Sequence, residues 1–238
     1  MSEFMRPISF SSLIEWALEE FKNTKSIFGI KEEKFYRNKT GKYLKTVFGD
    51  ELSSAVGPQS QLAQNIIASY LTGARYIEIK TVQIIDGEDI QKTIGRPCIN
   101  AEDECYNCEW STELTVQEAY AEYVKAYVAI LALAKELNIS DKKDFAYNMS
   151  VGYDLAGIQS EKIDTYIESL KDASNNDVFS EAKSYLKEHI DLFEHVTAED
   201  IDRISPEICT AITLSTLHGC PAEEIESIAE YLITEKKL

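Results

Sequence analysis

The sequence predicts an α/β fold built on a parallel sheet, and three observations support this. Strand-like segments rich in β-branched residues alternate with amphipathic helical segments. The helical segments are long enough to cross over between parallel strands. Hydrophobic residues make up 44% of the 238 positions and charged residues 27%, as in ordinary globular proteins. Two architectures fit this alternation, a doubly wound sheet and a (β/α)8 barrel. A G-x-G-x-x-G motif would favour the doubly wound sheet, but the sequence contains none.

A helix is expected near the start of the chain, from about Ser12. Ile14 and Phe21 recur at helical spacing, and Ser12 with Glu15 matches a capping box. We expect this helix and the polar stretch after it, residues 1–41, to form an N-terminal helical extension, with the sheet domain over residues 42–238.

Four segments with the pattern of strands follow, each with helical sequence behind it. The expected strands are residues 42–48, 75–82, 145–151 and 208–217, and the expected helices are residues 59–71, 115–138, 163–170, 179–193 and 221–237. Thr115 and Glu118 match a capping box, and Pro221 is placed to open the last helix, with Lys236 and Lys237 in its last turn. The pattern therefore predicts about four βα units with a helical insertion.

Composition and charge exclude several classes of protein. The formal net charge of −17 disfavours general nucleic-acid binding, because an acidic surface repels phosphate backbones. No run of 18 apolar residues occurs, so no membrane span is expected. The first ten residues lack the pattern of a secretory signal. The chain has five cysteines, an odd number, which disfavours a framework of disulfide bonds. We therefore expect a cytoplasmic protein with reduced thiols.

Polar residues mark the ends of the second and third expected strands. Glu78 and Lys80 share one face of a strand, where Lys80 could contact a cofactor; an exposed edge strand or a Glu78–Lys80 pair explains the charges equally well. Asn148 and Ser150 at the end of the third strand could bind the edge of a planar ligand. Ordinary turn chemistry is the competing explanation for them.

A third candidate site lies where the fourth strand meets the last helix. Cys220 could be a reactive thiol and His218 a proton donor, because a helix N-terminus attracts anions and lowers the pKa of a nearby thiol. Alternatively, Cys220 is a small buried apolar residue.

Three cysteines fall in the long segment after the second expected strand. Cys105 and Cys108 have the spacing of metal ligands, but with Cys98 they supply three local ligands where a closed zinc or iron–sulfur site needs four. Nearby acidic residues also raise thiol pKa values. Free thiols on a loop are therefore expected and no metal site, with a metal-binding module as the competing hypothesis.

Several long motifs resemble one known family. These are SIFGI, GPQSQLAQNI, EIKTVQI, RPCINAEDECYNCEWSTEL, NMSVGYDLAGI and LSTLHGCPAEEIE, at residues 26–30, 57–66, 78–84, 96–114, 148–158 and 214–226. Together, and in this order, they resemble the N-terminal region of the selenate reductase subunit family of multi-domain oxidoreductases. That region is similar to the flavin barrel of dihydropyrimidine and dihydroorotate dehydrogenases.

The resemblance implies a (β/α)8 (TIM) barrel with an FMN site. It implies cofactor contacts at the ends of successive strands, from Gly57, Lys80, Thr81, Asn148, Ser150, Thr213 and Ser215. The segment from Thr213 to Gly219 resembles the one that carries the catalytic cysteine in pyrimidine reductases, where Thr216 now stands in the place of that cysteine. Thr216, His218 and Cys220 are thus the candidate catalytic residues. The loop at Gly57 is shorter than is usual in the family.

Four strands make half of an eight-stranded barrel, and the loops after strands 7 and 8 hold the phosphate in such barrels. We therefore expect an N-terminal fragment or split-gene piece, inactive and weak in flavin binding by itself. Its expected partners are the remaining half barrel or redox subunits. The resemblance places iron–sulfur clusters and FAD/NADPH in other parts of the family architecture. The alternative function is a non-catalytic barrel scaffold that docks redox modules.

Overall fold

The computed structural model describes residues 7–47, 49–55, 57, 59–79, 114–151, 154–214 and 221–237. Its centre is a parallel sheet of four strands, β5 (Gln59–Ser60), β6 (Tyr76–Ile79), β7 (Ala146–Val151) and β8 (Cys209–Leu214). The strands lie in the order β5-β6-β7-β8, so each pairs with the strand that follows it in the sequence. A doubly wound sheet reverses its strand order, whereas a barrel does not. The order therefore favours the barrel architecture.

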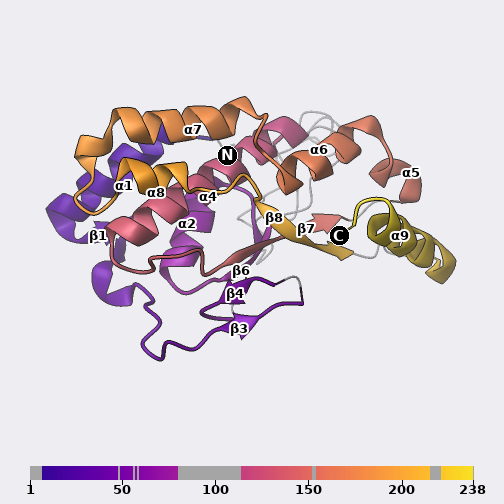
Figure 1. Ribbon diagram of the computed structural model, residues 1–238, viewed down its shortest axis with the longest axis horizontal. Helices are drawn as coiled ribbons and strands as arrows, with labels where there is room; N and C mark the ends of the chain where they lie inside the picture. The colour runs from indigo at the N-terminus through magenta and orange to yellow at the C-terminus, as the bar shows by residue number, and fades with distance from the viewer. Residues whose placement is uncertain are drawn as a thin grey trace, which may run out of the picture.

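Helices cover one face of this sheet. Figure 1 shows α1 (Phe10–Thr24), α2 (Ala63–Leu71), α4 (Val116–Glu136), α6 (Glu161–Lys171) and α7 (Asp177–Glu188) on the same side of the strands. The long helix α4 is central, because it packs against α2, α6 and α7. The short hairpin of β3 (Leu44–Lys45) and β4 (Glu51–Leu52) lies on the other side (Figure 1). Right-handed crossovers in a sequentially ordered sheet put the crossover helices on one face, and the described helices α2, α4, α6 and α7 have this arrangement.

The N-terminal elements share the core with the sheet domain. A small hairpin, β1 (Ser26–Ile27) with β2 (Ile30–Lys31), follows α1, and the 3-10 turn η1 (Glu32–Lys34) comes next. Leu13, Ile14 and Ala17 of α1 are completely buried in the same hydrophobic cluster as the sheet. The Nζ of Lys125 in α4 also donates to the carbonyl of Ile8, 2.7 Å away.

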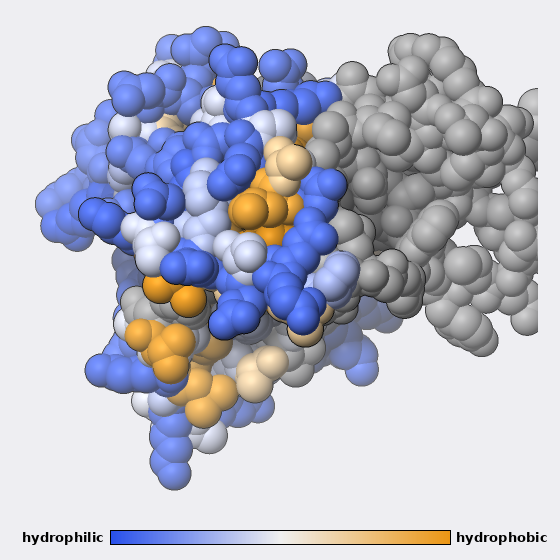
Figure 2. All heavy atoms as spheres, turned by 90° about the vertical axis from the view of Figure 1, so that its right-hand side faces the viewer, coloured by the Kyte–Doolittle hydropathy of each residue, from blue (hydrophilic) through white to orange (hydrophobic). Residues whose placement is uncertain are grey.

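The segment between β7 and β8 is helical. It contains α5 (Leu155–Ile158), α6, α7, the 3-10 turn η3 (Ile190–Leu192) and α8 (Ala198–Asp202), and the helix α9 (Ala222–Thr234) follows β8. Seen from the side of α5 and α9, the surface is mainly hydrophilic, with hydrophobic residues in small separate groups (Figure 2). In the described part of the chain, no helix is long and apolar enough to cross a membrane.

The structure corrects three expectations about the elements. Residues 42–48 contain β3, which pairs antiparallel with β4 and is not the first strand of the parallel sheet. That strand is β5, at the start of a segment expected to be helical. Its two residues are too few to show a strand periodicity.

The other two corrections concern helix ends. The N-cap of α1 is Ser9, whose hydroxyl accepts from the backbone N–H of Ser12, so Ser12 and Glu15 form no capping box. The helix α9 begins after Pro221, with Glu223 and Glu224 in its first turn, but it ends at Thr234, before Lys236 and Lys237. The capping box of Thr115 and Glu118 at the start of α4 is confirmed.

Candidate functional site

The two faces of the parallel sheet differ in chemistry. Ile77, Ile79, Tyr147 and Met149 are completely buried, and the Tyr147 ring lies 5.9 Å from the ring of Tyr127 in α4. Because strand residues alternate between faces, the residues between them point away from α4. Those residues are polar: Tyr76, Glu78, Asn148 and Ser150. Strands of a parallel sheet that is covered by helices on both faces are almost wholly apolar, because a buried polar group without a partner costs free energy. These polar residues therefore distinguish this face from the one that packs on α4.

The strand register brings the polar residues together near the carboxyl ends of the strands. Glu78 of β6 is the neighbour of Asn148 in β7, and Ser150 of β7 is the neighbour of Thr213 in β8. Three residues expected at the site, Asn148, Ser150 and Thr213, are thus on adjacent strands. Barrel enzymes place their active sites at this end of the strands. We take this group as the candidate site.

A hydrogen bond within the group orients two of its members. The hydroxyl of Tyr76 donates to Oδ1 of Asn148 at 3.2 Å. Partial burial raises the pKa of Tyr76, and the nearby Cys209 and Glu78 raise it further. Tyr76 therefore keeps its proton at neutral pH and remains a hydrogen-bond donor. Asn148 is 1% exposed, so its amide is held in place inside the protein.

Gln61 is a member of this region that the sequence did not reveal. It follows β5 directly and is 0% exposed, and among the described residues neither its Oε1 nor its Nε2 has a hydrogen-bond partner. The signal that could have found it is the polar–polar–polar run Gln59-Ser60-Gln61 at the start of a buried segment. The sequence pattern predicts a helix from residue 59, and this prediction is wrong for Gln59 and Ser60, which form β5.

Gly57 has a structural reason to be glycine. A Cβ at this position would lie 1.7 Å from the carbonyl oxygen of Tyr76, so no larger residue fits there without movement of the backbone. Gly57 thus lets the segment before β5 approach the first residue of β6. Its contact with a cofactor stays a prediction.

Other expected site residues lie outside the described residues. They are the cofactor contacts Lys80, Thr81 and Ser215 and the candidate catalytic residues Thr216, His218 and Cys220. The cysteines Cys98, Cys105 and Cys108 also lie outside. Among the residues that the structure does describe, no cluster of three or more His, Cys, Asp or Glu side chains could hold a metal ion.

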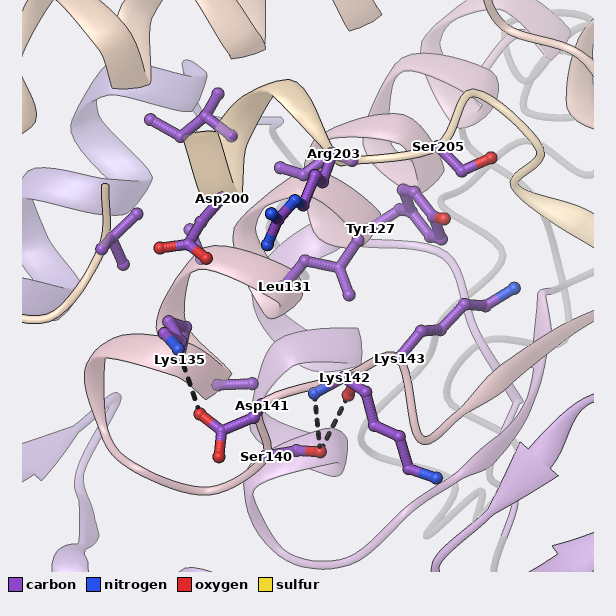
Figure 3. Close-up of a pocket in the computed structure, with 15 residues that line it drawn as sticks. Tyr127, Leu131, Lys135, Ser140, Asp141, Lys142, Lys143, Asp200, Arg203 and Ser205 are labelled. Atoms are coloured by element: carbon purple, nitrogen blue, oxygen red, sulfur yellow. Dashed lines mark hydrogen bonds and ion pairs between the residues drawn. The ribbon is translucent and has the colours of Figure 1, made fainter. Parts of the chain in front are cut away.

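A cavity of about 230 Å³ lies at the opposite end of the sheet (Figure 3). Its walls come from α4, the loop before β7, and α8 with the residues on either side of it. Lys135 pairs with Asp141 at 3.1 Å and Arg203 with Glu199 at 2.5 Å, so these cations already have acidic partners. Ligands of barrel enzymes bind at the carboxyl end of the strands, and this cavity is at the amino end.

A sequentially ordered parallel sheet with its crossover helices on one face is the arrangement found in the TIM-barrel class of α/β proteins. Residues 28–238 match the family model described as "Oxidoreductase YgfK, N-terminal TIM-barrel domain", and the chain belongs to this family. The expected oxidoreductase barrel family is thereby confirmed.

Two curated relatives are similar over the whole chain. The chain is 42% identical, across an alignment of 254 positions, to "Putative oxidoreductase YgfK" of Escherichia coli strain K12 and to its counterpart in strain O157:H7. The chain covers 24% of the length of each relative. No solved structure matches the chain.

Proposed function

We propose that this chain supplies the first strands of an FMN-dependent oxidoreductase barrel, which passes electrons within a larger iron–sulfur flavoprotein. The observation that carries the proposal is the polar group of Asn148, Ser150 and Glu78 on the face of the sheet opposite α4, together with the amide of Gln61, which has no hydrogen-bond partner among the described residues. Membership of an oxidoreductase barrel family supports the same conclusion.

The residues present fit the ring system of a flavin. Amide and hydroxyl groups on neighbouring strands offer both donors and acceptors, which a flat, polar-edged heterocycle requires. Asn148, Ser150 and Thr213 would contact the ring, and Lys80 and Thr81 would hold it at the end of β6. When bound, FMN supplies the capacity to accept and release electrons.

The same geometry predicts that the described strands hold FMN incompletely. Barrels of this class bind phosphate on the loops after strands 7 and 8. The parallel sheet of the described residues has four strands. We propose that further polypeptide, in the same or another chain, completes the barrel and holds the phosphate.

Replacement of Lys80 in the completed assembly tests the proposal. Lys80→Ala should reduce bound FMN at least tenfold, as measured by absorbance of the purified protein, because a charged contact to the flavin is lost. Lys142→Ala is the matched control, since Lys142 is half-exposed at the amino end of the sheet and should not change flavin content. Equal flavin in both variants contradicts the proposal.

The second candidate function is a non-catalytic scaffold that docks redox modules. The presence of Thr216 where the pyrimidine reductases carry their catalytic cysteine favours it. Under this alternative, Lys80→Ala leaves flavin content unchanged and alters the assembly with redox subunits. Analytical size exclusion of the same two variants separates the two functions.

A further inference from the structure

We propose that the side-chain amide of Gln61 is a ligand-recognition group, which binds the C(=O)–N–H edge of a planar heterocycle. The inference rests on the proposed function and deepens it, because the ring edge of a flavin carries this chemistry. Gln61 is completely buried, and in the part of the chain that the structure describes both polar atoms of its side chain lack a partner. A carboxamide left unsatisfied in this way costs free energy, so its retention needs a reason.

Gln61 differs from the other buried groups with an unpartnered atom. Arg75 has one such nitrogen, but its other nitrogens donate to Asp144 and to backbone carbonyls. The carboxylate of Glu122 forms an ion pair with Lys125. Tyr147 lies on the apolar face, against the rings of Tyr127 and Phe145. Gln61, in contrast, follows β5 at the end of the sheet where ligands bind in barrels.

The strand register indicates which side of the sheet Gln61 shares. Gln59 is the neighbour of Glu78, which in turn is the neighbour of Asn148. Gln61 is the first residue after β5, and continuation of the strand alternation over this one residue would give it the side of the polar group. Gln61 is two residues beyond Gln59 and Ser150 is likewise two residues beyond Asn148, so Ser150 and Gln61 are both one layer closer to the carboxyl ends of the strands than Gln59, Glu78 and Asn148. The amide therefore belongs to a polar layer at the carboxyl end of the sheet.

The chemistry of the side chain defines the ligand edge. A carboxamide presents one acceptor oxygen and an N–H donor in a single plane. A ring edge with a carbonyl beside an N–H satisfies both atoms at once. A site built in this way rejects a ligand that lacks either group, because the buried amide is then left unpaired.

The variant Gln61→Met gives opposite effects on stability and on binding. Methionine has similar length and no polar head to satisfy. The ligand-free chain should melt about 2–4 °C higher, the shift expected for a domain of this size when one unsatisfied polar group is removed. FMN and lumiflavin, titrated by fluorescence into the completed assembly, should bind the variant at least tenfold more weakly than the wild type.

Gln159→Met is the matched control, because Gln159 is exposed after α5 and should change neither quantity. A lower melting temperature for Gln61→Met in the ligand-free chain overturns the inference, as does flavin affinity equal to that of the wild type. Failure of the wild-type assembly to bind either flavin overturns the proposed function instead. Binding of lumiflavin separates contacts to the ring from contacts to the phosphate.

Discussion

Arg75 and Asp144 form a buried ion pair where β6 and β7 begin. Nε of Arg75 lies 2.9 Å from Oδ2 of Asp144, and both side chains are at most 3% exposed. The hydroxyls of Ser53 and Tyr70 donate to the same carboxylate at 2.5 and 2.8 Å. Burial raises the pKa of Tyr70 well above its usual value, so its hydroxyl stays a donor. The pair thus joins two strands, α2 and the segment after β4.

Removal of one partner should destabilise the protein strongly. Asp144→Ala is expected to lower the free energy of unfolding by about 3–5 kcal/mol, because it leaves the Arg75 guanidinium buried without its counter-ion. Urea denaturation followed by fluorescence measures the change. Lys45→Ala, which removes an exposed pair with Glu51 at 3.8 Å, is the control and should change the free energy by at most about 1 kcal/mol. Equal effects of both substitutions would contradict this account.

At the residue scale, strand alternation was enough to predict part of the candidate site. Glu78 was expected on the face opposite Ile77 and Ile79, and the burial of these residues agrees. Asn148 and Ser150 were expected at a strand end; both lie in β7 (Ala146–Val151), Ser150 next to its last residue and Asn148 in its middle. The pair of Arg75 and Asp144 was not expected, because 69 residues separate its members and no local pattern signals such a contact.

Glu122 connects two helices of the layer that covers the sheet. The N-cap position of α2 is Leu62, which has no side-chain acceptor. Oε2 of Glu122, in the second turn of α4, instead accepts from the backbone N–H of Ala63 at 2.8 Å. The carboxylate also pairs with Lys125. The first turn of α2 is therefore capped by another helix.

Loss of this carboxylate should destabilise α2 and its contact with α4. Glu122→Ala is expected to cost about 3–5 kcal/mol, because Lys125 is left buried and unpaired and the N–H of Ala63 loses its acceptor. Thermal unfolding by circular dichroism measures the loss. Thr115→Ala, which removes an ordinary exposed cap, should cost only about 1 kcal/mol. A cost for Glu122→Ala no larger than this would show that the interhelical cap is weak.

The end of the last described helix is attached to α6 through Lys236. Its Nζ pairs with Asp164 and lies 3.1 Å from Oε1 of Glu168. The hydrogen bond from Lys236 lowers the pKa of Asp164, and the hydroxyl of Tyr231 contributes, although partial burial opposes the shift. A carboxylate with a lowered folded-state pKa stabilises the folded protein when it is ionised.

The attachment of α9 to α6 should weaken in acid. The contribution of Asp164 is fully present above its unfolded pKa of about 3.9 and is lost as the pH falls through the lower folded-state pKa. Hydrogen exchange of the α9 amides between about pH 5 and pH 2.5 should reveal this loss of protection relative to other helices. In Asp164→Asn, relative protection of α9 should be lower and independent of pH in this range. A wild-type protection that does not change with pH would contradict the expectation.

At the element scale, the sequence predicted long helices better than short strands. The residues of α4 and α7 repeat their apolar positions over several turns, and caps such as Thr115 mark where they begin. β5 has two residues, so neither period is visible in it. Its place in the sheet is set by pairing with β6, a tertiary contact that local sequence does not encode.

The charge of the whole chain should make its stability depend on salt. Lys and Arg number 24 against 41 Asp and Glu, so 17 negative charges repel one another without a counterpart. Raising NaCl from about 10 mM to about 0.5 M shortens the Debye length from about 30 Å to a few ångströms and should raise the melting temperature. Differential scanning fluorimetry measures this. KCl should give the same curve, and a fall in melting temperature with either salt would contradict the argument.

The sequential strand order also bears on how the protein is made. Because β6 pairs with β5, β7 with β6 and β8 with β7, each new strand adds to a neighbour that was synthesised before it. The covering helices α2, α4, α6 and α7 come from the segments between those strands, so the apolar face of each strand can be shielded as these segments follow it. A chain with this connectivity can add its strands to the sheet in the order in which they are translated. On the ribosome, each strand of this sheet finds its pairing partner in sequence that has already been synthesised.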